Sequence, residues 1–365
     1  MRATIFRSGD LVVDTMPAPI PAEGQMLVKT LACGICGSDL HAAKHAHRMV
    51  EVTRRVPGRV PMDLSRDIVF GHEFCCEVLD YGPRTERKLK PGTRVCSMPV
   101  MMEADGPKGV GYSNHYVGGY AEQMLLSAPL VLEVPNGLAT EHAALTEPIA
   151  VGVHAVEKAL LNGDEAPLVV GCGPVGLAVI AALRLKHIRP IVAADFSQKR
   201  RELAVRMGAD IVVDPADEDP YARLAAGRCA VLFECVGVPG LIQQALEKAP
   251  RDARIVVVGV CMEPDAIEPM FGIVKEISLQ FVLGYTPEEF ARSLRLLAEG
   301  AIDASALVTG KIGLDDVKNA FQELANPERH TKILIEPWRG HDPSAVRMTW
   351  FCDSTNSGTK RGMRQ

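Results

Sequence analysis

Apolar positions in the first part of the chain fall in short runs that are separated by turn residues. Residues 26–30, 75–79 and 94–98 are such runs, and the last follows a Pro-Gly turn at 90–93. Short runs bounded by glycine and proline are typical of strands in antiparallel sheets. The pattern therefore predicts a β-rich domain over residues 1–148.

The pattern changes near residue 149, where strands begin to alternate with helices. We predict strands at 168–170, 190–194, 211–213, 230–233 and 254–258, and helices at 175–186, 198–207 and 287–299. Such alternation is produced by βαβ units and predicts an α/β domain with a doubly wound parallel sheet. We assign this domain to residues 149–286.

Composition limits the possible partners. A chain of 365 residues exceeds what one core usually supports, which agrees with two domains. A formal charge of -5 gives no electrostatic reason to expect nucleic acid or membrane as a partner. Ten cysteines without dense, even spacing do not form a disulfide framework, so we expect a cytoplasmic protein. Residues 341–365 show little periodicity, and we expect a disordered tail there.

Two short segments suggest a metal site. Cys36 lies in a glycine-rich polar turn, and His72 and Glu73 follow Gly71 about 35 residues later. A thiolate, an imidazole and a carboxylate suit a zinc ion that keeps one coordination position open for a substrate. A cysteine alone is weak evidence, because free thiols are common in protein cores.

A glycine loop suggests a dinucleotide site. Gly171, Gly173 and Gly176 follow an apolar run and, with Pro174 and Val175 between them, open a helical pattern. Such glycines allow a tight turn and a close approach of backbone to pyrophosphate. Asp195 follows at a predicted strand end, where a carboxylate binds the adenosine ribose and repels a 2′-phosphate, so we expect NAD. Arg200 and Arg201 keep NADP as an alternative.

Together these segments resemble the zinc-dependent alcohol dehydrogenases of the medium-chain dehydrogenase/reductase superfamily, and within it the polyol, threonine and secondary-alcohol branch. The resemblance covers about residues 1–337 and is also carried by Gly118-Gly119-Tyr120-Ala121-Glu122, Glu147-Pro148 and Glu234-Cys235-Val236-Gly237. It implies a GroES-like catalytic domain, to which residues 287–340 return, and a Rossmann cofactor domain. It also implies hydride transfer between a small alcohol and NAD.

The resemblance further implies roles for single residues. Cys36 and His72 match zinc ligands, Glu147 matches a third ligand, and Glu73 matches an acid that binds the metal or stands beside it. One thiolate and one carboxylate neutralise zinc, so we expect Glu147 to bind, directly or through water, and Glu73 to exchange on and off.

Ser38 and His41 match residues that handle the alcohol proton. Ser38 matches a hydroxyl that touches the substrate oxygen, and His41 matches a base that collects the proton. Their alternative interpretations are a helix N-cap for Ser38 and a surface histidine for His41.

Other expectations concern metal count, assembly and rival functions. No cysteine lies between Cys96 and Tyr120, so we expect one catalytic zinc and no structural zinc.

The apolar run at 276–283 predicts a homodimer or homotetramer, because an unpaired apolar edge strand is unfavourable unless another chain covers it. The alternatives are an NADP-preferring enzyme, a non-catalytic dinucleotide-binding relative, or a zinc-free quinone reductase. The last two are disfavoured because Cys36, Ser38 and His72 are all present.

Overall fold

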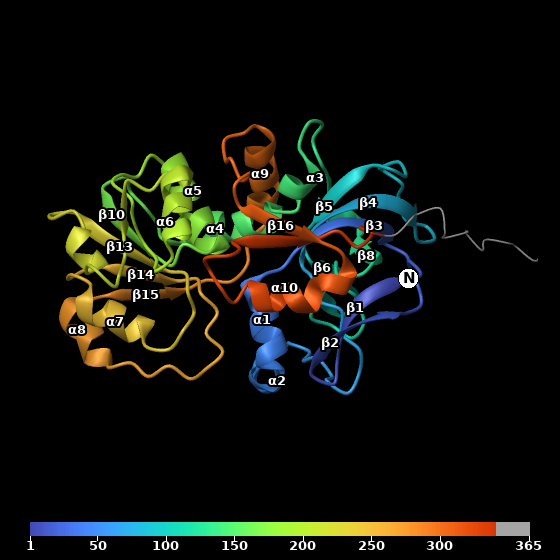
Figure 1. The fold of residues 1–365 in the computed structure, drawn as a ribbon, viewed down its shortest axis with the longest axis horizontal. Helices are drawn as coiled ribbons and strands as arrows, with labels where there is room; N and C mark the ends of the chain where they lie inside the picture. Colours follow the sequence, from blue (N-terminus) through green and yellow to red (C-terminus); the bar gives the residue numbers. More distant parts are fainter. Residues whose placement is uncertain (341–365) are drawn as a thin grey trace, which may run out of the picture.

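A computed structural model describes residues 1–340, and the predicted tail at 341–365 lies outside the described residues. Two lobes lie side by side along the long axis (Figure 1). One lobe holds the candidate metal ligands, and the other holds the glycine loop. Among the described residues, no helix combines the length and apolar character needed to cross a bilayer.

The first lobe is built on a seven-stranded sheet in the order β16-β17-β3-β4-β5-β9, with β8 also paired to β3. Its strands are β3 (Gln25–Gly34), β4 (Glu73–Tyr81), β5 (Arg94–Ser97), β8 (Gln123–Ser127), β9 (Val131–Glu133), β16 (Val308–Ile312) and β17 (Lys332–Ile335). The last two come from the end of the described chain, and β17 pairs antiparallel with β3. Residues about 300 positions apart therefore meet at the end of β3.

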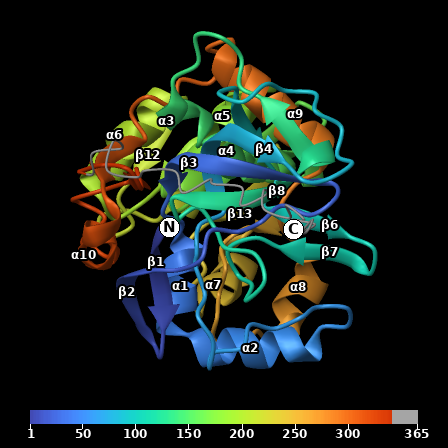
Figure 2. The ribbon, with the colours of Figure 1, turned by 90° about the vertical axis from the view of Figure 1, so that its right-hand side faces the viewer.

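Smaller elements surround this sheet. They are the hairpins β1–β2 (Arg2–Arg7, Asp10–Thr15) and β6–β7 (Val100–Glu103, Gly106–Gly109), the helices α1 (Gly37–Lys44), α2 (Ala46–Arg55), α3 (Thr140–Ala143) and α10 (Val317–Glu323), and the 3-10 turns η1 (Ala128–Leu130) and η3 (Leu314–Asp316). Seen along the long axis, α1 and α2 lie together below β3 and β4 (Figure 2).

The second lobe confirms the predicted doubly wound parallel sheet. Six parallel strands follow the order β12-β11-β10-β13-β14-β15. They are β10 (Glu165–Val170), β11 (Val192–Ala194), β12 (Ile211–Val213), β13 (Cys229–Glu234), β14 (Arg254–Val257) and β15 (Ser278–Phe281). The connections contain α5 (Pro174–Leu185), α6 (Gln198–Met207), η2 (Pro220–Arg223), α7 (Leu241–Lys248) and α8 (Pro269–Lys275).

Two helices join the lobes. The helix α4 (Thr146–Lys158) continues through the predicted domain boundary at residues 148 and 149. Pro148 is compatible with this helix because the first-turn N–H groups have no intrahelical partner. The helix α9 (Pro287–Ala298) packs on α4, and its Thr286 and Glu289 form a capping box. One hydrophobic cluster runs from Ala32 and Cys75 through α4 into α5 and α9.

Candidate active site

Cys36 is presented at the junction of a strand and a helix. It is the N-cap of α1, two residues after β3 ends at Gly34. The carboxylate of Asp39 accepts a hydrogen bond from the Cys36 backbone N–H at 2.9 Å. This bond satisfies one of the otherwise unpaired donors at the helix start and fixes the backbone that carries the thiol.

His72 and Glu73 lie beside two glycines whose missing side chains leave room for the site. Gly71 has φ +105°, and a Cβ there would lie 2.6 Å from the Tyr120 ring and 2.9 Å from the Gly119 nitrogen. Gly34 pairs with Glu73 across β3 and β4, and a Cβ on Gly34 would lie 2.1 Å from a Glu73 carboxylate oxygen. The Glu73 carboxylate therefore occupies the space that a side chain at position 34 would fill.

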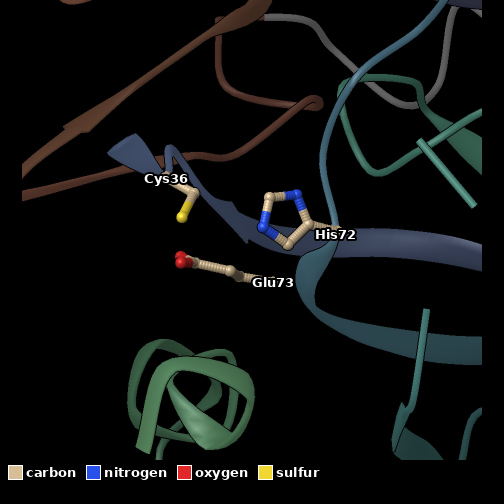
Figure 3. Close-up of side chains that lie close together, drawn as sticks. All are labelled: Cys36, His72 and Glu73. Atoms are coloured by element: carbon tan, nitrogen blue, oxygen red, sulfur yellow. The ribbon is translucent and has the colours of Figure 1, made fainter. Parts of the chain in front are cut away.

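Cys36, His72 and Glu73 converge on one point (Figure 3). One ligand atom from each lies within 4.8 Å of the others, and within residues 1–340 this is the one such group of three. A sulfur, a nitrogen and an oxygen about 2.0–2.3 Å from a common ion suit tetrahedral zinc. Three protein ligands leave the fourth position for a substrate. The donor set thus fits the metal that the sequence predicts.

Asp39 orients the imidazole. Its Oδ1 lies 3.4 Å from His72 Nδ1, so Nε2 is the nitrogen left for the metal. The hydroxyls of Tyr112 and Tyr120 donate to Asp39 at 2.6 and 2.8 Å. Burial opposes a charge on His72, but Asp39 and Cys36 raise the pKa of the imidazole above its ordinary value. A carboxylate behind the distal nitrogen is how proteins commonly hold a metal-binding histidine.

Lys332 is the site residue that sequence reasoning missed. Its Nζ lies 2.8 and 2.6 Å from the two oxygens of Glu73, and it donates to the carbonyl of Ile35 at 3.0 Å. The side chains of Lys332 and Glu73 are 1% and 0% exposed. A lysine at the start of the short apolar strand β17 was the available signal, because a buried ammonium requires an anionic partner.

Glu147 stands outside the group of three. It lies in the first turn of α4 and is buried, and burial raises its pKa to about 7. The hydroxyl of Tyr285 interacts with its carboxyl. Our charge argument for Glu147 as the bound acid was incomplete because it did not count Lys332, whose positive charge allows two carboxylates at the site.

Ser38 is close to the predicted ligands, whereas His41 is further along α1. Because Cys36 is the N-cap, the interpretation of Ser38 as a cap is wrong. Ser38 Oγ instead lies 3.5 Å from His72 Nε2 and 2.9 Å from the Tyr112 hydroxyl. His41 is half-buried with its ring 6.4 Å from that of His45, and burial lowers its pKa.

The glycine loop has the geometry that pyrophosphate binding requires. Gly171 has φ +91°, and a Cβ there would lie 2.6 Å from Val236. A Cβ on Gly176 would lie 1.9 Å from the Gly171 carbonyl oxygen, so only glycine allows α5 to pack this close to β10. Gly173 faces open space, with its nearest neighbour, Arg200, 3.9 Å away. Pro174 and Val175 open α5, whose N-terminus favours an anion.

Asp195 and Arg200 lie together beside this loop. Asp195 follows β11 and accepts hydrogen bonds from the backbone N–H groups of Cys172 and Ser197, at 2.7 and 2.8 Å. Arg200 Nη1 lies 3.9 Å from Asp195 Oδ2. Arg201 instead forms an ion pair with Asp214 at 2.8 Å and donates a hydrogen bond to the backbone carbonyl of Asp195. Of the two arginines, Arg200 is therefore the one near the expected ribose.

Between Cys96 and Tyr120, where a cysteine-rich segment would be needed for a structural zinc, the chain forms the short β6–β7 hairpin. That the chain binds a single zinc ion stays a prediction.

Comparisons with known proteins agree with this geometry. Residues 22–136 match the alcohol dehydrogenase GroES-like domain, and residues 174–299 match the zinc-binding dehydrogenase family. The chain is 31% identical to (R,R)-butanediol dehydrogenase of Bacillus subtilis over 342 residues, which cover 90% of this chain and 97% of that protein. The crystal structure of the Bacillus subtilis 2R,3R-butanediol dehydrogenase matches with a TM-score of 0.78, 30% identity and coverage of 92% and 99%.

Two further relatives extend this range. Sorbitol dehydrogenase of Bacillus subtilis is 25% identical over 92% of this chain and 97% of its own length. A zinc-binding dehydrogenase from Sinorhizobium meliloti, whose structure is bound to NADP, matches with a TM-score of 0.79, 26% identity and coverage of 92% and 99%. The chain therefore belongs to the zinc-dependent alcohol dehydrogenases of the medium-chain dehydrogenase/reductase superfamily.

Proposed function

We propose that this enzyme oxidises a secondary alcohol or vicinal diol to the ketone with NAD, at one zinc ion held by Cys36, His72 and Glu73. The observation that carries the proposal is the convergence of these three side chains within 4.8 Å, with Ser38 beside His72. The substrate class is supported by the relatives named for butanediol and sorbitol.

The bound ion would lower the pKa of a coordinated hydroxyl to about 7. The chain's own residues then decide how the alcohol is held. Ser38 Oγ lies next to His72 Nε2, which places it beside the oxygen of an alcohol in the open position. Asp39 keeps the imidazole in its orientation, and Lys332 holds Glu73.

The buried ion pair supports Glu73 as the third ligand and leaves Glu147 as an acid beside the site. Lys332 contacts both oxygens of Glu73 and offsets its negative charge, so that a thiolate at Cys36 and a carboxylate at Glu73 can face a divalent ion together. Glu147, with its raised pKa, is suited to exchange a proton with a water at the edge of the site.

NAD is the proposed cofactor, and its support is the carboxylate of Asp195, which follows β11 and lies beside the glycine loop, where we expect the adenosine ribose. This carboxylate would repel a 2′-phosphate. Arg200, 3.9 Å away, supports NADP as the second candidate, and the Sinorhizobium relative was solved with NADP.

We further propose that chains associate through the exposed edge strand β15. Phe281 and Leu283 are 61% and 77% exposed on this side of the six-stranded sheet, and Met270 and Ile273 of α8 are also exposed. An apolar edge strand is stabilised when another chain covers it.

A panel of alcohols tests the function. Purified enzyme is assayed with secondary alcohols, vicinal diols, polyols and primary alcohols, with NAD or NADP, and absorbance at the reduced nicotinamide band is followed. We expect the highest kcat/KM for a secondary alcohol or diol with NAD, and loss of activity in Cys36→Ser. The proposal would be contradicted if the zinc-loaded enzyme oxidised none of these alcohols with either cofactor.

A further inference from the structure

Two histidines lie one helical turn apart at the end of α1. The backbone N–H of His45, the C-cap of this helix, donates to the carbonyl of His41 at 2.8 Å. This bond fixes the two residues at positions i and i+4, which are neighbours on one helix face. Their rings are stacked, with centroids 6.4 Å apart and an angle of 27° between the planes. The two imidazoles therefore face each other outside the group of Cys36, His72 and Glu73.

Both rings have nitrogens that are available to a ligand. In the described part of the chain, the histidine rings that form hydrogen bonds are those of His72, His154 and His330. The ring nitrogens of His41 and His45 are also not among the buried polar atoms that lack a partner. Since these nitrogens are neither bonded to protein nor buried, solvent reaches them.

The surroundings keep His41 in the form that binds a metal. Burial, together with the positive neighbours His45 and Lys44, lowers the pKa of His41 below its ordinary value. The imidazole is therefore neutral above about pH 7, and the neutral ring is the metal ligand. The C-terminal end of a helix carries partial negative charge and favours a cation. Lys44 opposes a cation, but its side chain is exposed and free to extend into solvent.

The spacing of the two rings is close to what a shared ion requires. Two imidazoles that bind one ion at about 2.0–2.1 Å have ring centroids roughly 5 Å apart. From 6.4 Å, the rings would have to approach by about 1.4 Å. Both side chains are only partly buried, and the outer torsion of histidine has a broad energy profile, so side-chain rotation achieves this approach.

We propose that His41 and His45 form a second metal site, which takes an exchangeable divalent transition-metal ion such as zinc, nickel or cobalt. Imidazole nitrogen suits these ions, and water fills their remaining coordination positions. Two protein ligands hold an ion less tightly than three. This ion therefore exchanges with solvent and does not add to the zinc that stays bound during purification.

Occupation of this site should inhibit the enzyme. A neutral imidazole has one nitrogen lone pair, and an ion that takes the lone pair of His41 leaves no position for a proton. The inhibition rests on the proposed function, with His41 as the base that collects the alcohol proton. The binding of the ion does not depend on that function.

Nickel tests the binding because Ni²⁺ favours imidazole and is not reduced by the thiols of the chain. Zinc-loaded enzyme, freed of loosely bound metal on a desalting column, is titrated with Ni²⁺ by calorimetry at about pH 7.5, where the histidines are neutral. We expect one nickel per chain. His45→Gln should weaken this binding by at least about tenfold, because the second ligand of a chelating pair binds intramolecularly. His41→Gln should cause a similar loss and serves as an independent second variant.

His47→Gln is the matched control, since His47 is an exposed histidine two positions further along and is not part of the stacked pair. Its nickel affinity should stay within about twofold of wild type. The site would be overturned if wild type bound no nickel, if His45→Gln bound it as tightly as wild type, or if His47→Gln lost as much affinity as His45→Gln.

Activity tests the inhibition separately. Without nickel, His45→Gln should keep kcat/KM within about twofold of wild type, because its side chain forms no capping bond. Ni²⁺ should inhibit wild type near its calorimetric dissociation constant, and His45→Gln should require at least about tenfold more. Nickel that binds the pair without slowing oxidation would overturn the inhibitory role. An enzyme that oxidises no alcohol even before nickel is added would instead count against the proposed function, and calorimetry would still decide whether the site exists.

Discussion

Lys332 and Glu73 form a fully buried ion pair although they lie 259 residues apart in the chain. One ammonium contacts both oxygens of the carboxylate, at 2.6 and 2.8 Å. Burial disfavours the charge on Lys332, but Glu73 outweighs this and raises the pKa of the lysine above its ordinary value. The pair holds the proposed zinc ligand in place and links β17 to β4 across β3.

Lys332→Met should therefore destabilise the zinc-free enzyme strongly. It leaves a buried carboxylate without a partner, which costs about 3–5 kcal/mol. Urea unfolding after chelation measures the change. Lys311→Met is the matched control, because Lys311 pairs with Glu141 at 2.9 Å but is 34% exposed. That pair should contribute below about 1 kcal/mol.

The same variant should bind zinc more tightly, since one positive charge beside the ion is removed. Competition with a chromogenic chelator measures this affinity. The double variant Lys332→Met/Glu73→Gln removes both charges, so it should recover much of the lost stability. Equal losses of stability in Lys332→Met and Lys311→Met would show that the buried pair has no special role.

Glu147 should make the stability of the zinc-free enzyme fall as pH rises. Its pKa is about 7 in the folded chain, raised mainly by burial, against an ordinary value of 4.5. Between these values the folded state keeps a proton that the unfolded state has released, so stability declines from pH 4.5 to 7 and then levels off.

Glu147→Gln removes this proton and should flatten the decline. The difference in unfolding free energy between the variant and wild type should shift in favour of the variant, by at most ~3 kcal/mol, as the pH rises from 5 to 8. Bound zinc should make the pH profiles of wild type and Glu147→Gln more alike, because a nearby cation stabilises the Glu147 carboxylate and lowers its pKa. Parallel pH profiles for the two zinc-free proteins would argue against a perturbed Glu147.

Asp195 should determine the choice between the two cofactors. Wild-type kcat/KM should be higher with NAD than with NADP. Asp195→Ala should lower the ratio of these two kcat/KM values by about tenfold, since it removes the charge that repels a 2′-phosphate and leaves Arg200 without its carboxylate neighbour. Asp214→Ala, which removes the partner of Arg201 and a hydrogen bond from the Ala216 backbone N–H but leaves Asp195 and Arg200 in place, should keep the preference. Equal use of NAD and NADP by the wild type would contradict this assignment.

The exposed edge strand β15 should mediate association. Leu283→Lys places a charge at a side chain that is 77% exposed in a single chain, and we expect it to shift a dimer or tetramer toward monomer in sedimentation velocity. Ile20→Lys, at an 87% exposed residue of the other lobe, should leave the assembly unchanged. A wild type that sediments as a monomer at micromolar concentration would contradict association through β15.

Local patterns in the sequence predict much of this enzyme. Alternating strands and helices predict the parallel sheet, and β11, α5 and α6 lie within two residues of their predicted bounds. Glycines at 71, 171 and 176 mark places where backbone approaches neighbouring atoms closely. These features can be predicted from the sequence because the periodicity of apolar residues and the spacing of glycines depend only on neighbouring residues.

Contacts between distant segments could not be predicted in the same way. Lys332 reaches Glu73 only because β17 pairs with β3, and spacing does not reveal that register. Tyr112 likewise reaches Asp39 from a separate loop. The charge count made from the sequence left out Lys332 for the same reason, since this residue is 259 positions from Glu73.

Zinc content is the measurement that tests the central claim most directly. Mass spectrometry of the purified enzyme under native conditions should give about one zinc per chain, and Cys36→Ser should lose it, whereas Cys261→Ser, a half-buried cysteine elsewhere, should keep it. Full retention of zinc by Cys36→Ser, or two tightly bound zinc ions per wild-type chain, would contradict a single site at Cys36, His72 and Glu73.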